Sequence, residues 1–448
     1  MNSTLACLAG WMAHQRWYSS KTSAPRLRLL ARHGMASGDS DARVEVYIVV
    51  DDSVEPAITY QVPVVTRLLP SPGDDRRVIG VVDGATLVDG PHDEAYARAL
   101  LAALQPHASP TATPPVLAMH RDVSSRVLDG EQSNTSIIFT PDAGAPVICK
   151  VFRQLNPGVN PDIELQSALA RAGSPHVPQS VGHIEADWAD PRDPGRTVTG
   201  SLVFAQEFLP GVEDAWRVAG RTAAGGGSFA AAAHALGAAT ADVHLSLARL
   251  FPTVDADPAA RAAVAEAWQR RLSIAVSEVP AISRHRAAVA AVYARALDIL
   301  WPPLQRIHGD LHLGQVLQTP GKGWVLVDFE GEPMRPIRER RLPDSPLRDI
   351  AGMLRSFDYV AGSLRDTSTS DLDAWSHASR DAFLGGYEHR AGTPTTGPLL
   401  DAFELDKAVY EAIYEARNRP GWLSIPLAAI ERLVREHAPG ADRNPPPR

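Results

Sequence analysis

The sequence has little that would suit a secreted, membrane-spanning or cysteine-rich protein. Only two of its 448 residues are cysteines, Cys7 and Cys149, and they form no metal-ligand pattern. Because Cys149 lies inside an apolar run, we expect a reduced, buried thiol and a cytoplasmic protein. No stretch approaches 18 consecutive apolar residues, so we expect no membrane span, and the N-terminus lacks the cationic lead-in of a signal peptide.

An excess of positive charge is also lacking. The chain carries 44 Lys and Arg residues against 52 Asp and Glu residues, a formal net charge of -8. This balance excludes a general nucleic-acid-binding surface, although a local basic site can still hold a nucleotide phosphate. Hydrophobic residues make up 44% and charged residues 21%, which is typical of a globular chain long enough for roughly three domains.

Three shifts in composition divide the chain. Residues 105–115 (QPHASPTATPP) indicate a linker, residues 221–228 (RTAAGGGS) a flexible loop, and residues 438–448 a frayed tail. Strands are predicted at 44–50, 58–65, 135–140, 146–152 and 201–208, with helices at 93–104 and 161–172. After the loop, helices are predicted at 229–250, 259–276, 284–300, 347–360, 372–389 and 400–417, interrupted by a hairpin at 314–328. This order predicts an α+β protein with the two-lobed architecture of a nucleotide kinase.

The most informative stretch is residues 307–333. It contains HGDLH at 308–312, then Gln315, then an apolar strand that delivers Asp328. Phosphoryl transfer from ATP needs a carboxylate near the acceptor hydroxyl and oxygen ligands for magnesium. Asp310 and Gln315 have the spacing of the catalytic Asp and metal-binding Asn of protein kinases, and Asp328 precedes a phenylalanine as a D-F-G aspartate does. The alternative for Asp310, a loop carboxylate that caps a turn, does not account for the paired motifs.

Two histidines flank the predicted catalytic residue. We expect His308 and His312 to hold this loop by hydrogen bonds rather than to bind a metal, because no third ligand has suitable spacing.

The upstream sequence supplies candidate nucleotide contacts. Lys150 lies on an apolar strand where it could reach the ATP phosphates, and Glu164 in the next helix could hold it by an ion pair. Taken singly, either could be a surface charge. The turn at 130–136 offers donors for phosphate, although an ordinary hairpin turn has the same composition. The strand end at 206–208 would be the hinge whose backbone binds adenine. The candidates in these two segments are Ser133, Asn134, Thr135, Gln206, Glu207 and Phe208.

These motifs carry a family resemblance that covers nearly the whole chain. The chain resembles the aminoglycoside-phosphotransferase-like sugar kinases, specifically the actinobacterial maltokinase and glucosamine kinase group. The matching segments are QRWY (15–18), YQVP (60–63), GEQSNTS (130–136), NPDIEL (160–165), HGDLHLGQVL (308–317), DFEGEP (328–333), DSPLRDIAGMLRSFD (344–358) and LDKAVYEAIYEARNRPGW (405–422). The resemblance implies an N-terminal cap subdomain (1–115), an ATP-binding lobe (116–209) and a helical lobe with the catalytic loop and sugar site (210–448).

The resemblance also implies roles for single residues. Asp310 would be the catalytic base, Gln315 and Asp328 the magnesium ligands, and Lys150 a phosphate ligand. Asp349 would be the aspartate that braces the catalytic loop. The required cofactor is Mg²⁺, with ATP as co-substrate.

The acceptor side is predicted on the helix at 400–417. One face carries Lys407, Glu411 and Glu415 at successive i+4 steps, with tyrosines beside them. Carboxylates and aromatic rings suit sugar recognition, whereas a solvated charged face is the ordinary interpretation of such a stripe. The resemblance favours the sugar site, for which the candidates are Asp310, Glu330, Glu411, Tyr414, Glu415 and Trp422.

The sequence therefore predicts an ATP- and magnesium-dependent sugar kinase with small-molecule partners and no nucleic-acid or membrane partner. Acidic cleft residues would favour glucosamine, phosphorylated at its 6-hydroxyl, but the resemblance places the same acids in maltokinases, which phosphorylate maltose at the anomeric hydroxyl. A short, glycine-rich stretch at 210–228 departs from maltokinases and inclines the prediction to glucosamine. An inactive kinase fold that serves as a binding module is the alternative from another class.

Overall fold

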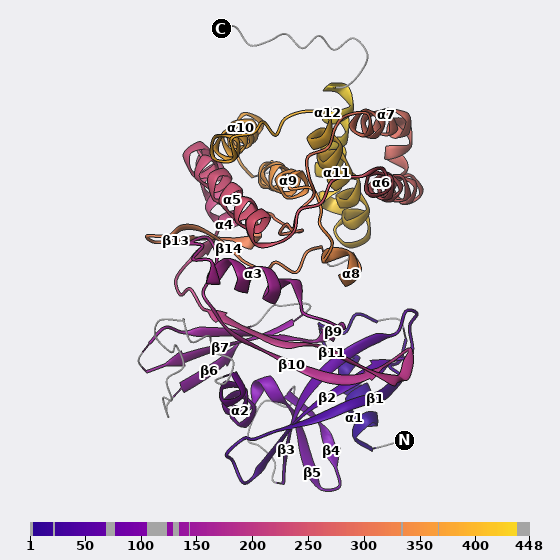
Figure 1. Ribbon diagram of the computed structural model, residues 1–448, viewed down its shortest axis with the longest axis vertical. Coiled ribbons are helices and arrows are strands. Elements are labelled where there is room, and N and C mark those ends of the chain that lie inside the picture. The colour runs from indigo at the N-terminus through magenta and orange to yellow at the C-terminus, as the bar shows by residue number, and fades with distance from the viewer. Residues whose placement is uncertain are drawn as a thin grey trace. The chain divides into compact units, whose positions relative to one another are not determined.

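The computed structural model describes residues 3–20, 23–68, 77–104, 123–128, 134–142, 144–332, 335–365 and 367–436 (Figure 1). The predicted linker at 105–115 and tail at 438–448 lie outside these residues. The chain divides into two compact units. Unit 1 comprises Met1–Ser167 and Pro178–Pro210, and unit 2 comprises Ala168–Val177 and Gly211–Arg448. The division of the sequence into three parts stays a prediction.

The first sheet of unit 1 is antiparallel, and its central strands are buried on both faces. Its strands are β1 (Leu27–Met35), β2 (Ala42–Asp51), β3 (Ile58–Arg67), β4 (Val78–Val82) and β5 (Ala85–Asp89), in the order β1-β2-β3-β5-β4, with β9 (Gln154–Leu155) also paired to β3. Alternate residues of β2 enter different cores: Val46 packs with α2 (Glu94–Leu104), and Tyr47 with α1 (Ser3–Met12). Because each face meets a helix, β2 is apolar almost throughout instead of alternating with polar residues.

The second sheet of unit 1 carries the predicted nucleotide residues. Its strands are β6 (Val123–Val127), β7 (Asn134–Pro141), β8 (Val147–Phe152), β10 (Ser180–Asp190) and β11 (Asp193–Glu207), in the antiparallel order β10-β11-β8-β7-β6. The predicted strand at 201–208 is the end of the longer β11, whose hairpin partner β10 the sequence analysis missed. Helix α3 (Pro161–Arg171) confirms the helix predicted at 161–172.

A buried arginine joins the two sheets of unit 1. Arg153 follows β8 and is 1% exposed. Its Nη2 donates to both carboxylate oxygens of Asp89 at 3.0 Å, and its Nε donates to Thr135 Oγ1 at 2.8 Å. The guanidinium lies 4.8 Å from the centre of the Trp17 ring. A buried guanidinium of this kind is stable only while its carboxylate partner is present.

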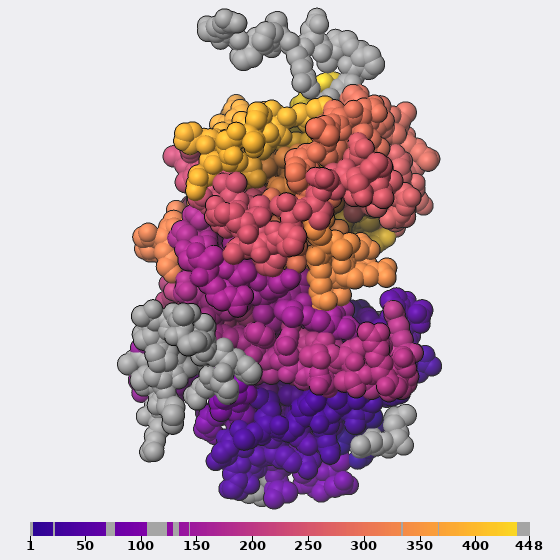
Figure 2. Space-filling model, viewed as in Figure 1, coloured from indigo at the N-terminus to yellow at the C-terminus, as the bar shows by residue number. Residues whose placement is uncertain are grey.

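Unit 2 is mainly helical. It contains α4 (Ala215–Ala224), α5 (Ala230–Leu250), α6 (Pro258–Glu278), α7 (Arg286–Leu297), α8 (Ile337–Arg340), α9 (Leu347–Ser363), α10 (Leu372–Ala391), α11 (Pro398–Asn418) and α12 (Ser424–Glu436). A small sheet of β12 (Glu213–Asp214), β13 (Val316–Thr319) and β14 (Gly323–Leu326) confirms the predicted hairpin. Each predicted helix after residue 228 is confirmed with ends displaced by a few residues. In Figure 2, the yellow residues of α12 lie against the salmon residues that precede and form α7.

Two helices of unit 2 approach unusually closely. Gly237 on α5 faces the backbone of α10, and Gly386 on α10 faces the backbone of α5, so a Cβ on either residue would collide with the opposite helix. Glycine at both positions therefore permits this packing. Helix α9 is buried over most of its length and lies among α5, α10 and α11 (Figure 1).

The prediction of a flexible loop at 221–228 is wrong for residues 221–224. Helix α4 continues through Ala224 and is capped at Gly225. Asp214 begins the helix by accepting a hydrogen bond from Arg217 N, and Arg221 forms a two-pronged pair with Glu213 at 2.8 Å. The glycines marked the end of a helix, and the alanines before them are strong helix formers. Among the described residues, no helix has both the length and the apolarity needed to cross a bilayer.

Replacing Arg153 by Met should destabilise unit 1. The substitution removes the partner of a buried carboxylate, so we expect the free energy of unfolding to fall by about 3–5 kcal/mol. Urea unfolding should be compared with Arg28→Met, which removes a solvent-exposed partner of Asp52 and should cost under about 1 kcal/mol. Equal effects of the two substitutions would contradict a structural role for the Arg153 pair.

Candidate active site

A buried carboxylate holds the predicted catalytic loop. Asp349, in the first turn of α9, is 1% exposed. Its Oδ2 accepts from the backbone N–H of His308 at 2.8 Å, and its Oδ1 accepts from that of Gly309 at 2.8 Å. Gly309 has φ +86°, a conformation that favours glycine. The loop therefore turns sharply just before Asp310 and is tied to the start of α9.

A histidine completes the environment of Asp349. His244 on α5 places Nε2 3.0 Å from Asp349 Oδ2 and Nδ1 2.9 Å from the Tyr387 hydroxyl. Since a carboxylate only accepts, Nε2 carries the proton. Burial alone would raise the pKa of Asp349, but the hydrogen bonds from His244 and Gly309 outweigh burial and lower it.

The two histidines hold the loop by hydrogen bonds, as the sequence predicted. His308 Nε2 donates to the carbonyl of Val327 at 3.0 Å, and the ring centre lies 4.5 Å from that of Phe329. His312 Nδ1 accepts from the backbone N–H of Gly314 at 3.1 Å. The ring of His308 thus ties the loop to Val327, which follows β14 and directly precedes Asp328.

The structure brings Gln315 and Asp328 together. Gln315 Nε2 donates to Asp328 Oδ2 at 2.9 Å, and the Val327 N–H donates to the Gln315 carbonyl at 3.0 Å. Asp328 has φ +69°, an unusual conformation for a residue other than glycine. Such strain often occurs at functional sites. Carboxylate and amide oxygens suit Mg²⁺, and in this arrangement the amide nitrogen of Gln315 is the atom that faces Asp328.

Lys407 of α11 lies between two carboxylates. Its Nζ donates to Asp310 Oδ1 at 3.2 Å and to Glu332 Oε1 at 2.7 Å. Burial alone would lower the pKa of Lys407, but Glu332 and Asp310 outweigh it and raise the pKa. Burial would likewise raise the pKa of Glu332, yet Lys407, Arg348 and Arg271 lower it to about 2. In the sequence, Lys407 belongs to the charged face of the helix predicted at 400–417, and its spacing indicates no partner in the predicted catalytic loop.

The solvated-face interpretation of α11 is wrong. Glu411 is 9% exposed and Glu415 1% exposed. Glu411 accepts from Arg355 Nε at 2.9 Å, while Glu415 accepts from the Tyr359 hydroxyl at 3.1 Å and from Arg419. Arg355 and Arg419 therefore balance the negative charges of these two carboxylates. Their role as acceptor ligands stays a prediction.

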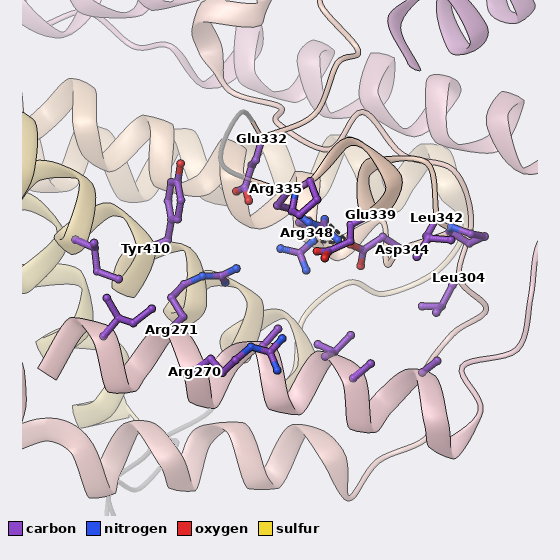
Figure 3. Close-up of a pocket in the computed structure, with 18 of the residues that line it drawn as sticks. Arg270, Arg271, Leu304, Glu332, Arg335, Glu339, Leu342, Asp344, Arg348 and Tyr410 are labelled. Carbon is purple, nitrogen blue, oxygen red and sulfur yellow. Dashed lines mark hydrogen bonds and ion pairs between the residues drawn. The ribbon is translucent and has the colours of Figure 1, made fainter. Parts of the chain in front are cut away.

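A pocket of about 570 Å³ lies between α6, α8 and α11 within unit 2 (Figure 3). Tyr410, Glu332 and Arg271 lie toward one end, and Leu304 and Leu342 toward the other. Of the predicted acceptor residues, Tyr414 lines the pocket. Asp310, Glu330, Glu411, Glu415 and Trp422 are not among its described lining residues. The pocket nevertheless reaches the catalytic loop through Glu332, whose carboxylate binds Lys407.

Trp422 belongs to a neighbouring aromatic cluster. The Arg419 guanidinium lies 4.7 Å from the Trp422 ring centre and 5.4 Å from that of Tyr414. The ring centres of Trp422 and Tyr359 are 6.1 Å apart. The polar end of this cluster is Glu415, which accepts from both Arg419 and Tyr359.

In unit 1, the ion pair of Lys150 involves a residue that the sequence analysis missed. Lys150 Nζ lies 2.8 Å from Asp162 Oδ2, and Asp162 is 1% exposed in the first turn of α3. The available signal was the acid directly after the helix-starting proline. Glu164 lies half-buried in the same turn, and its predicted role stays a prediction.

The remaining nucleotide candidates lie at strand ends of unit 1, except Ser133, which is outside the described residues. Asn134 and Thr135 begin β7, where the Thr135 hydroxyl accepts from Arg153. At the predicted hinge, the Phe208 N–H donates to the Pro146 carbonyl at 2.9 Å. The side chains of Gln206 and Glu207 accept from Gln166 and from the Gln179 N–H. Adenine and phosphate binding by these residues stays a prediction.

Replacing Asp349 by Asn should destabilise the protein in a pH-dependent way. The amide offers one acceptor where the carboxylate offers two, and the loss of charge-assisted bonds should cost about 1.5–3 kcal/mol near neutral pH. Because folding lowers the pKa of Asp349, its contribution is present above the unfolded pKa of about 4 and is lost as the pH falls through the folded value. In urea unfolding, the difference in the free energy of unfolding between wild type and variant should therefore become smaller as the pH falls from 5 to 3. The exposed Asp381→Asn is the control and should show almost no gap; a gap for Asp349→Asn that is independent of pH would contradict this account.

The chain is similar in sequence to known phosphotransferases. A model of the maltokinase N-terminal cap domain matches residues 11–93, and a model of the phosphotransferase enzyme family matches residues 124–399. The chain is 31% identical over 339 residues to a glucosamine kinase of Streptacidiphilus jiangxiensis, covering 68% of this chain and 72% of that protein. It is 29% identical over 334 residues to a glucosamine kinase of Mycolicibacterium smegmatis, covering 69% and 80%.

A solved structure shares the fold. A glucosamine kinase in one crystal form superposes with a TM-score of 0.71 and 24% identity, covering 97% of this chain and 100% of that chain. A glucosamine kinase in complex with glucosamine, ADP and inorganic phosphate gives a TM-score of 0.64 at 23% identity, covering 96% and 98%. The predicted α+β, kinase-like fold with an N-terminal cap is thus confirmed. The chain belongs to the phosphotransferase enzyme family and carries a maltokinase-type N-terminal cap domain.

Proposed function

We propose that the protein transfers the γ-phosphoryl group of ATP to glucosamine and so forms glucosamine 6-phosphate. The observation that carries this proposal is the braced loop of unit 2, in which Asp349 fixes the turn before Asp310 and Gln315 contacts Asp328. The similarity to two glucosamine kinases over about two thirds of the chain supports glucosamine as acceptor in preference to maltose. ATP as co-substrate and the buried thiol of Cys149 favour the cytoplasm.

The proposed chemistry uses Asp310 as the base. The acceptor hydroxyl docks against the Asp310 carboxylate, which takes its proton as the oxygen attacks the γ-phosphorus. A new oxygen–phosphorus bond forms, the bond from the γ-phosphorus to the bridging oxygen breaks, and its electron pair leaves with ADP. The catalytic step therefore depends on Asp310 being ionised and correctly turned.

Gln315 and Asp328 are the proposed magnesium ligands. Their oxygen donors suit a hard cation, and the unusual backbone of Asp328 places its carboxylate beside Gln315. Bound magnesium would supply positive charge to the transferring phosphoryl group. Lys150, held by Asp162, is the proposed phosphate contact of unit 1.

The pocket beside Glu332 is the proposed acceptor pocket. Tyr410 and Tyr414 offer aromatic faces for a pyranose ring, and Glu339 offers negative charge to the amino group of glucosamine. Glu330, Glu411, Glu415 and Trp422 stay predicted acceptor residues.

A coupled assay that measures ADP formation with glucosamine, glucose and maltose tests the function. We expect the highest kcat/KM with glucosamine. Preference for maltose would favour a maltokinase. ATP binding without turnover on any sugar would favour the binding-module alternative.

Replacing Asp310 by Asn should remove most turnover while leaving ATP binding intact. The amide has nearly the shape of the carboxylate but does not accept the hydroxyl proton, and a general base contributes on the order of 10²–10⁴ in rate. The measurements are kcat with glucosamine and calorimetric ATP affinity. A kcat within a few-fold of wild type would show that Asp310 is not the base.

Replacing Asp328 by Asn should weaken magnesium-dependent ATP binding. Asparagine tolerates the left-handed backbone, so the variant removes charge while keeping the loop conformation. Titration calorimetry with and without Mg²⁺ isolates the metal-dependent part of the affinity. Gln315→Ala should have a smaller effect, since a neutral amide binds the metal less strongly than a carboxylate. If Asp328→Asn binds ATP and Mg²⁺ as wild type does, Asp328 has only a structural role.

A further inference from the structure

We propose that Lys407 is the positioning residue for Asp310, holding its carboxylate turned toward the acceptor, with Glu332 as the anchor that keeps Lys407 in place. This inference rests on the proposed function, because it concerns the base of the same reaction. Lys407 lies 97 residues beyond Asp310 in the sequence and is brought to it by α11.

The geometry leaves the two Asp310 oxygens in different environments. Lys407 Nζ lies 3.2 Å from Oδ1, so this oxygen is occupied by a charge-assisted hydrogen bond. The carboxylate can then present Oδ2 to an acceptor hydroxyl. Fixing one oxygen reduces the rotational freedom of the base, which is how positioning accelerates a proton transfer.

Glu332 holds the ammonium group of Lys407 in one position. Its carboxylate is 4% exposed and lies 2.7 Å from Lys407 Nζ. It stays ionised because the positive charges of Lys407, Arg348 and Arg271 outweigh its burial. Lys407 also lies 5.1 Å from the centre of the Tyr410 ring, which limits the directions available to the ammonium group.

The charge around Asp310 comes from several elements. His312 lies in its own loop, where burial lowers the histidine pKa, and Arg340 approaches from α8. Helix α11 contributes Lys407 and Tyr410. Of these groups, Lys407 forms the ion pair with the Asp310 carboxylate. Removing Lys407 should therefore release the Asp310 carboxylate from this ion pair and let it rotate.

The test compares Lys407→Met, Lys407→Arg and Glu332→Gln, with Lys322→Met in the exposed turn between β13 and β14 as the matched control. For Lys407→Met we expect kcat with glucosamine to fall about 10- to 100-fold, with the KM for ATP within twofold of wild type. Lys407→Arg should recover most of kcat, and Lys322→Met should match wild type.

Glu332→Gln tests the anchor. The variant keeps Lys407 but removes the carboxylate that holds it, so kcat with glucosamine should fall by less than in Lys407→Met, with the KM for ATP within twofold of wild type. A folded Lys407→Met variant with wild-type kcat would overturn the proposal, as would a Lys407→Arg variant no more active than Lys407→Met. If Lys407→Met does not fold, a Glu332→Gln variant with wild-type kcat would overturn it. Absence of wild-type turnover on any sugar would contradict the proposed function instead, since the Lys407 comparison starts from an active wild type.

Discussion

The candidate active site depends on one buried carboxylate. Asp349 accepts two backbone N–H groups of the catalytic loop and one imidazole N–H, all from within unit 2. Taking a carboxylate out of water is unfavourable unless its lone pairs are satisfied, and here three donors satisfy them. Because two of these donors belong to consecutive residues of the loop, the carboxylate sets the direction of the turn that carries Asp310. A neutral side chain of the same size would leave the turn without this constraint.

The same principle explains why so many charged side chains are buried among α9, α10, α11 and α12. Arg355 is fully buried and contacts both Asp358 and Glu411, while Glu404 is held by Arg380 and Arg432. Each charge has an opposite charge within hydrogen-bonding distance, so burial does not leave it unpaired. Networks of this kind define the register of two helices more narrowly than apolar contacts do, because a shift by one residue would separate several pairs at once. Helix α11 is thereby fixed where Lys407 meets Asp310.

Periodicity and motif spacing predicted the helices of unit 2, the hairpin and the meeting of Gln315 with Asp328. They could not identify partners brought together by tertiary packing. Lys150 pairs with Asp162 although Glu164 is equally compatible with the spacing, since both acids lie in the first turn of α3. The stripe of Glu411 and Glu415 matched a solvated face because a sequence does not reveal that Arg355 and Arg419 supply counter-charges. The alanines at the end of α4 fall inside the predicted loop because the glycines after them dominate the composition of residues 221–228.

Asp310, the proposed base, is held from two directions by two different helices. The start of α9 fixes the backbone of the loop before Asp310 through Asp349, and the middle of α11 fixes its side chain through Lys407. The pocket that we assign to the acceptor shares Glu332 with this arrangement but is otherwise lined by other residues, chiefly of α6, α8 and α11. The far end of the pocket, toward Leu304 and Leu342, is therefore formed by residues that do not hold Asp310. We therefore expect substitutions there to alter which sugar fits without disturbing the hydrogen bonds that orient Asp310.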